Sequence, residues 1–229
     1  MLRTPITLTA AALAAALALS ACGTVRLGAA AVTNTSRVPT ATVSAEVNNL
    51  DAAYQAHKAK VQLQFPVSRM PQQVLSWLLR FQVREQMANR NHLVITRSEV
   101  QAALASATAQ ARQSGVTLTE LAIANGVPPN QLPELGRYVA IQNELLDQLD
   151  GGKLPTASGA LQTLGSTFNQ YQCRAAKSMG ISVNPQFGQL DYSQISVVPA
   201  PAKLAADSAT ASPSPSASPS ASPQLTPAC

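Results

Sequence analysis

The chain contains three cysteines and two histidines, and only one of these five residues lies in a pattern that predicts chemistry. Cys22 ends an N-terminal segment in which Arg3 is followed by a run of apolar, alanine and threonine residues and then by Leu19–Ala21. A basic start, an apolar stretch and small residues before a cleavage point are the parts of a secretory signal. The apolar run is too short and too rich in Ala and Thr for a transmembrane helix, which needs about 20 strongly apolar residues. We therefore expect residues 1–21 to direct export.

The four residues Leu19–Cys22, with Gly23 behind them, resemble the lipobox of bacterial lipoproteins. The resemblance implies that the Cys22 thiol receives a diacylglyceryl group and that the chain is cut before Cys22. Residues 22–26 would then form a lipidated N-terminus on the extracytoplasmic face of the cell membrane. Each buried methylene of an acyl chain contributes about 0.8 kcal/mol to such an anchor. A plain secretory signal that ends in cysteine is the alternative.

No other group of residues predicts catalysis. His57 and His92 stand alone in the sequence, and no Cys–His cluster with metal-ligand spacing occurs. Asp147 and Asp150 lie three residues apart at an expected helix end, where solvated carboxylates are more common than an acid–base pair. Motifs of nucleophilic hydrolases, zinc proteases and nucleotide-binding loops are missing from the sequence. We expect no enzymatic activity, no metal and no cofactor.

The C-terminal segment, residues 199–229, consists almost entirely of Pro, Ala and Ser before it ends at Cys229. Such a composition offers few large apolar side chains to offset the entropy cost of ordering, so we expect a disordered tail. Cys173 lies on the flank of an expected helix, and its one plausible partner is Cys229. We expect a weak, optional disulfide and no catalytic role for Cys173.

The charge pattern argues against nucleic acid as a partner. The chain has 16 Lys and Arg residues against 11 Asp and Glu, a net charge of +5, but the basic residues are scattered and no aromatic residues interleave with them. Nucleic-acid-binding surfaces normally concentrate basic residues on one face. An exported protein also has no access to cytoplasmic nucleic acid. We expect at most a mild attraction to anionic lipid or wall polymer.

Residues 27–198 read as one mainly α-helical domain with short strands near both chain ends. Helical periodicity is strongest around Val74–Phe81 and in the stripe from Leu161 to Met179. Thr96 with Glu99, and Thr117 with Glu120, form capping-box patterns. Another helix is expected from residue 45 to 61, capped by Thr42 or Ser44, and a further one is expected to end before Gly151. Residues 27–32, 181–185 and 194–198 have the composition of short strands.

This order of elements resembles the N-terminal domain of SurA-type periplasmic chaperones and related PrsA-type foldases, including actinobacterial lipoproteins with a low-complexity tail. The segments that carry the resemblance are Ile95–Val100, before the third helix, and Val183–Gly188, after the last one. The resemblance implies a strand after the last helix that pairs with the N-terminal strand. The chain departs from the family in two respects. Thr33–Val38 is all that represents the family's usual turn after the first strand, and Lys153–Pro155 stands where a parvulin isomerase domain often interrupts the fold.

The resemblance implies a membrane-anchored chaperone or holdase that binds unfolded or extended exported polypeptides in apolar grooves, without catalysis. Candidate groove residues are Trp77, Phe81, Phe168 and Tyr171, although their spacing fits a helix core equally well. Two alternatives remain open at this point. One is a foldase related to proline isomerases, and the other is a structural lipoprotein of the cell envelope.

Overall fold

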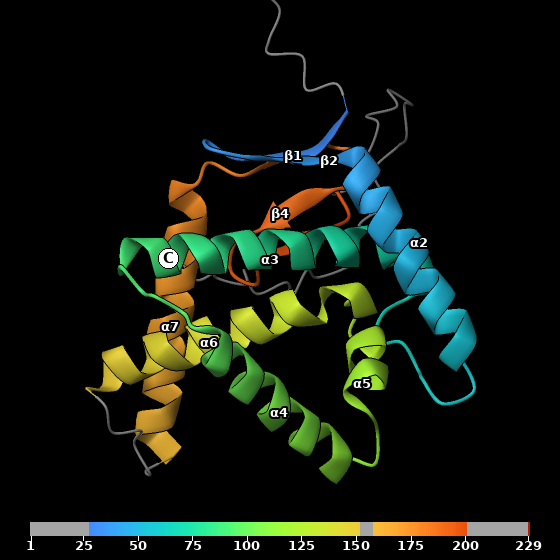
Figure 1. Cartoon of the computed structure of the whole chain (residues 1–229). Helices are drawn as coiled ribbons and strands as arrows, with labels where there is room; N and C mark the ends of the chain where they lie inside the picture. The colour runs from blue at the N-terminus through green and yellow to red at the C-terminus, as the bar shows by residue number, and fades with distance from the viewer. Residues whose placement is uncertain (1–27, 152–157, 201–228) are drawn as a thin grey trace, which may run out of the picture.

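A computed structural model describes residues 28–151, 158–200 and 229, and this part of the chain is mainly helical, as the sequence predicts (Figure 1). The export signal, Cys22, the linker at 153–155 and most of the C-terminal segment lie outside the described residues. The helices are α2 (Thr40–His57), α3 (Met70–Arg90), α4 (Arg97–Gln113), α5 (Leu118–Ala124), α6 (Leu132–Asp150) and α7 (Ser158–Ser178). Two 3₁₀ turns, η2 (Val67–Arg69) and η3 (Pro129–Gln131), precede α3 and α6.

Helix α3 is the centre of the core. Its inner side chains are fully buried, and they pack against α2, α6, α7 and the last strand. These residues recur at helical spacing: Val74, Leu75, Leu79, Val83 and Met87. Burial of each such side chain contributes about 1.5–3 kcal/mol, so α3 supplies a large share of the hydrophobic stabilisation. Pro71 lies in the first turn of α3, where its missing N–H leaves no hydrogen bond unmade.

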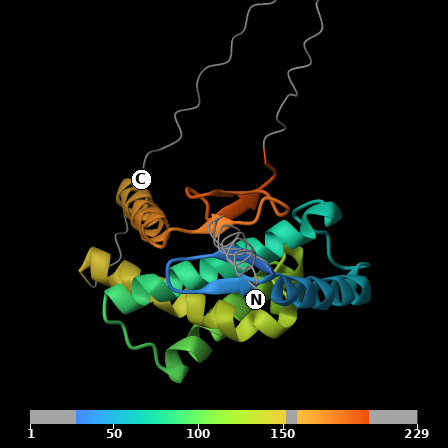
Figure 2. The same cartoon turned by 90° about the horizontal axis from the view of Figure 1, so that it is seen from above.

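The two ends of the domain meet in a small antiparallel sheet with the strand order β2-β1-β3. The strands are β1 (Ala29–Val32), β2 (Arg37–Pro39) and β3 (Ser182–Val183), and Ala31 lies opposite Val183. The strand after the last helix thus pairs with the first strand, as expected. The sheet lies on the side of α3 away from α4 and α6 (Figure 1, Figure 2).

A second hairpin joins β4 (Gln189–Asp191) to β5 (Ser196–Val198), and β4 was not expected from the sequence. A strand of three residues is too short to show a period-2 pattern. The hairpin is fastened to α3 because the backbone N–H of Val197 donates to Ser76 Oγ at 2.8 Å. The Ser76 hydroxyl in turn donates to the carbonyl of Gln72 at 2.6 Å.

Both expected capping boxes are present, but the expected cap of α2 is wrong. Thr96 and Thr117 each accept a hydrogen bond from the backbone of the glutamate three residues later. In return, each glutamate carboxylate accepts hydrogen bonds from its threonine. The bond from the backbone N–H has the larger effect and the bond from the hydroxyl the smaller one, and both lower the pKa of Glu99 and Glu120. Helix α2 begins at Thr40, upstream of Thr42 and Ser44, because the Thr40 N–H donates to the carbonyl of Gly28 at 2.8 Å.

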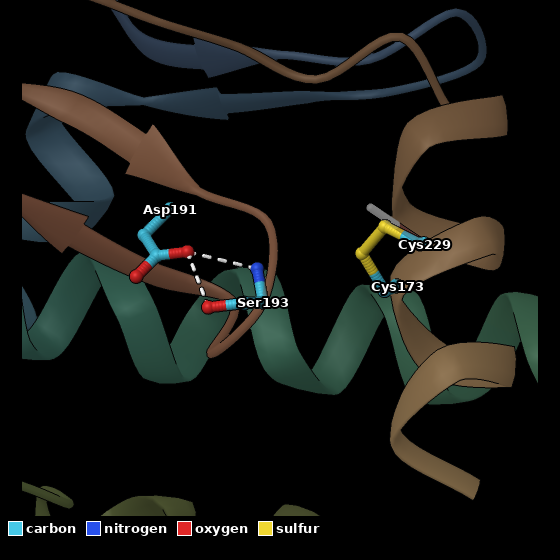
Figure 3. The surroundings of a disulfide bond; sticks show 4 residues. All are labelled: Cys173, Asp191, Ser193 and Cys229. Atoms are coloured by element: carbon cyan, nitrogen blue, oxygen red, sulfur yellow. Dashed lines mark hydrogen bonds between the residues drawn. A yellow bond between two sulfur atoms is a disulfide. The ribbon is translucent and has the colours of Figure 1, made fainter. Parts of the chain in front are cut away.

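Cys173 and Cys229 form a disulfide, with their Cα atoms 5.7 Å apart, beside the turn between β4 and β5 (Figure 3). Cys173 is only 4% exposed, so the position expected on the flank of the last helix is a buried one. The turn is held by Asp191 Oδ1, which accepts from the backbone N–H of Ser193 at 2.8 Å and from its hydroxyl at 2.7 Å. The last residue of the chain is therefore fixed to α7.

Loss of this disulfide should destabilise the fold. The bond closes a loop between residues 56 positions apart, and the chain-entropy model gives an upper limit of about 4 kcal/mol for such a loop. Cys229→Ser should lower the free energy of unfolding by up to that amount, and reduction of the wild-type protein should have the same effect. Peptide mapping without reductant should recover the Cys173–Cys229 link stoichiometrically. Two free thiols in protein isolated under oxidising conditions would contradict this pairing.

Candidate functional site

An apolar groove opens among α4, α5 and α6, next to the first half of α3, and encloses about 200 Å³ of free volume. These helices lie on the same side of α3 (Figure 1). The side chains at its wall are almost all aliphatic or aromatic and lie half-buried or exposed: Trp77, Leu104, Ala107, Leu118, Leu121, Leu135 and Val139. We call this surface the apolar groove. Half-buried apolar side chains that converge on one depression are typical of a site for an apolar ligand or peptide.

Trp77 is held in place at the groove by its polar atom. The indole N–H donates to the carbonyl of Asn125 at 2.8 Å, and the amide of Gln73 donates to the same carbonyl at 2.9 Å. Asn125 is the C-cap of α5, where carbonyl groups lack helical partners. The indole N–H is therefore satisfied within the protein, and the apolar surface of the ring lines the groove.

Neighbouring rings fix the tilt of the indole. The centroid of Trp77 lies 5.7 Å from that of Phe81 and 5.9 Å from that of Tyr138, the latter in an edge-to-face arrangement. The guanidinium of Arg80 lies over the indole ring, 4.9 Å from its centroid. Aromatic pairs at these distances contribute about 0.5–1.5 kcal/mol beyond burial. Trp77 is thus a rigid part of the groove wall.

The rim of the groove is formed by α5. Leu121 is 37% exposed, while its neighbours Ala122 and Ile123 are buried against the rest of the fold. Across the groove, Leu104 of α4 packs closely on Gly136 of α6. A Cβ added at Gly136 would lie 3.0 Å from both methyl carbons of Leu104, so a larger residue would push the two helices apart. This close approach sets the width of the groove between α4 and α6.

Of the four groove candidates named from the sequence, only Trp77 lines the apolar groove in the structure. Phe81 does not line it and is buried next to the Trp77 ring with 8% exposure. Phe168 and Tyr171 lie on α7; Phe168 is 5% exposed, and the Tyr171 hydroxyl contacts the side-chain amide of Asn91. The groove residues that sequence reasoning missed are the leucines at 104, 118, 121 and 135. In the sequence each of these leucines looks like a core residue of its helix. Whether it is buried or exposed depends on how far apart the neighbouring helices lie in the folded protein.

A second groove of the described structure is lined by acidic side chains. A wider groove of about 450 Å³ between α4 and α6 carries the acidic side chains Glu99, Glu144 and Asp147. Within residues 28–151, 158–200 and 229, no three His, Cys, Asp or Glu side chains are grouped so that they could hold a metal ion. The described helices include none with the length and apolar character needed to cross a bilayer.

Comparison with protein-family models and with curated proteins found no match for this chain. The assignment of a function therefore rests on the residues and the geometry given above.

Gly126 should be essential for the position of Trp77. It follows the C-cap of α5 with φ +78°, and a Cβ there would overlap the Gln73 side chain and lie 2.9 Å from the Phe65 ring. Gly126→Ala should lower the free energy of unfolding by about 2–4 kcal/mol through left-handed strain and overpacking, and should shift the emission of Trp77, the one tryptophan of the chain.

The matched control for Gly126→Ala is Gly115→Ala. Gly115 has nearly the same backbone angle, φ +76°, but no atom lies within 4 Å of an added Cβ. This variant should lose only the strain component, about 1–2 kcal/mol, with unchanged Trp77 emission. Equal effects of the two variants in denaturant titrations would mean that the contacts of Gly126 do not position the indole.

Proposed function

We propose that the protein is a membrane-anchored, extracytoplasmic holdase that binds apolar segments of unfolded exported polypeptides in the apolar groove, without turnover. The observation that carries the proposal is the groove itself, in which an indole with a satisfied N–H and an exposed leucine face the same space. The SurA-type resemblance of the sequence supports the proposal, as does the pairing of β3 with β1.

The size of the groove favours weak and reversible binding. A free volume of about 200 Å³ accommodates only one or two apolar side chains at a time. Each apolar side chain transferred from water contributes about 1.5–3 kcal/mol before the cost of ordering the client is subtracted. Such binding would slow aggregation and still release the client without ATP, as a holdase requires.

The proposed location outside the cytoplasm has two independent supports. The first is the N-terminal sequence, in which an export signal ends at Cys22. The second is the Cys173–Cys229 disulfide, because disulfides persist in oxidising compartments and are rare in the cytosol. Lipid on Cys22 would keep the groove close to the membrane where exported chains emerge.

Substitution at the rim should separate client binding from folding. Leu121→Lys places a charge in the apolar groove, and because Leu121 is exposed the cost in stability should be within about 0.5 kcal/mol. The wild-type protein should suppress aggregation of a model protein that is unfolded in denaturant and then diluted without reductant, so that the Cys173–Cys229 disulfide stays intact. Leu121→Lys should require about tenfold more protein for the same effect, which corresponds to the loss of one buried leucine contact.

The matched control is Leu161→Lys on α7, where a leucine of similar exposure, 46%, lies outside the groove. This variant should suppress aggregation as well as the wild-type protein. If the wild-type protein protects none of several unrelated clients, the holdase proposal fails and a structural role in the envelope is favoured. A protease-coupled assay that detects proline isomerisation would instead favour a foldase.

Cys22 is the proposed site of lipid attachment. Cys22→Ser should move the protein from the membrane fraction to the soluble fraction, or leave it uncleaved, because serine cannot form the thioether. Cys229→Ser is the control, since it removes a cysteine without touching the signal; although it breaks the disulfide, it should still fractionate with the membrane. A Cys22→Ser protein that is processed and still fractionates with the membrane would exclude a lipid anchor at this position.

A further inference from the structure

A polar pocket of about 320 Å³ lies further along α3 than the apolar groove, between α6, α7 and the β4–β5 turn. Arg80 and Arg84, one helical turn apart on α3, both line it. Among the described residues that line it there is no aspartate or glutamate. The described lining of the pocket therefore carries two positive charges and no balancing carboxylate.

Arg84 is the least expected residue of this pocket, because it is only 1% exposed. An arginine side chain stays protonated in proteins, so its burial leaves a charge that must be compensated. Its two terminal nitrogens donate to Gln142 Oε1 at 3.2 Å and to Gln172 Oε1 at 2.8 Å. Its Nε–H has no acceptor among the described residues.

Two aromatic rings also contact Arg84. Its guanidinium lies 4.0 Å from the centroid of the Tyr138 ring and 4.7 Å from that of Phe168. Burial lowers the pKa of both Arg84 and Arg80, and Tyr138 acts in the opposite direction. Neutral amides and rings orient the guanidinium but do not neutralise it. A purely structural role at this position would be filled at lower cost by an apolar side chain.

Arg80 is the more accessible of the two. It is half-buried, and its Nε and one terminal nitrogen donate to the carbonyl of Gln194 at the long distances of 3.4 and 3.3 Å. In the described part of the chain, neither Arg80 nor Arg84 has a carboxylate within ion-pair distance; the ion pair found there joins Arg137 to Glu85. Asp191, in the adjacent hairpin, already accepts two hydrogen bonds from Ser193.

We infer that this pocket binds an oxyanion, the carboxylate or phosphate group of a small ligand, through Arg80 with Arg84 as the buried second charge. The planar guanidinium matches both groups geometrically, and charge-assisted hydrogen bonds are about twice as strong as neutral ones. The amide of Asn169, which is exposed at the pocket wall, is a further donor. This inference does not depend on the proposed holdase activity.

The test uses the full-length protein and two probes, inorganic phosphate and succinate, titrated against sodium chloride at constant ionic strength. Trp77 reports the binding, because it is the one tryptophan of the chain and Arg80 lies over its ring. At least one probe should give a saturable change in Trp77 emission and raise the melting temperature. The probe that saturates identifies the anionic group of the ligand.

Two variants locate the site, and calorimetric titration is used for them because Arg80→Gln itself alters the indole environment. Arg80→Gln should weaken binding at least about tenfold, while Arg90→Gln, an exposed position on the same helix, should not. Gly165→Met fills the pocket from α7 without removing charge. An added Cβ at Gly165 meets no atom within 4 Å, so this variant should fold and still lose binding.

Gly159→Met is the control for the occluding variant, since Gly159 lies on the same helix, is equally free of contacts and does not line the pocket. It should bind like the wild-type protein. The inference is overturned if neither probe saturates beyond the chloride control. It is also overturned if binding survives in both Arg80→Gln and Gly165→Met, because the anion would then bind elsewhere.

Discussion

The burial of α3 on almost all sides is the constraint on which the rest of the structure depends. Its aliphatic residues hold α2, α6, α7 and β5 around it. One stripe of the same helix carries no aliphatic core residues and consists of Gln73, Trp77, Arg80, Phe81 and Arg84. Because these positions recur at helical spacing, a single rigid element presents an indole to one depression and two guanidiniums to another.

The apolar groove is maintained by backbone features more than by its own side chains. Asn125 offers one carbonyl to both Trp77 and Gln73, and Gly126 turns the chain directly behind it. Gly136 permits α4 to pack closely on α6. The half-buried leucines between these points stay accessible because the surrounding helices are already fixed by α3. Because the groove is already held open, binding a ligand there costs little conformational entropy of the groove residues.

The local features of the fold could be predicted from the sequence, whereas the sites could not. Thr96 with Glu99 and Thr117 with Glu120 form caps that depend only on nearby residues, so the sequence pattern alone predicts where these two helices begin. The start of α2 was missed because its N-terminal donor is satisfied by Gly28, which is distant in sequence. The strand β4 is too short to carry a periodic signal.

The sites depend on tertiary arrangement, and this is why sequence reasoning reached them only in part. Trp77 was named as a groove candidate because it is aromatic, but Phe81 and Phe168 have the same periodicity and are buried. Leu121 has no local feature that distinguishes it from a core leucine. Arg84 reads as an ordinary surface residue of an amphipathic helix, and its burial follows only from the meeting of α6 and α7 over α3.

The most direct test of the proposed holdase function is site-specific photocrosslinking of the full-length protein to a defined unfolded client. A photoreactive residue replaces Leu121 at the rim of the groove or Leu161 on α7, which have similar exposure. Binding in the apolar groove should give a crosslinked product from position 121 that disappears when the client is allowed to fold, and little product from position 161. Equal crosslinking from the two positions, or none from position 121, would contradict binding in the apolar groove.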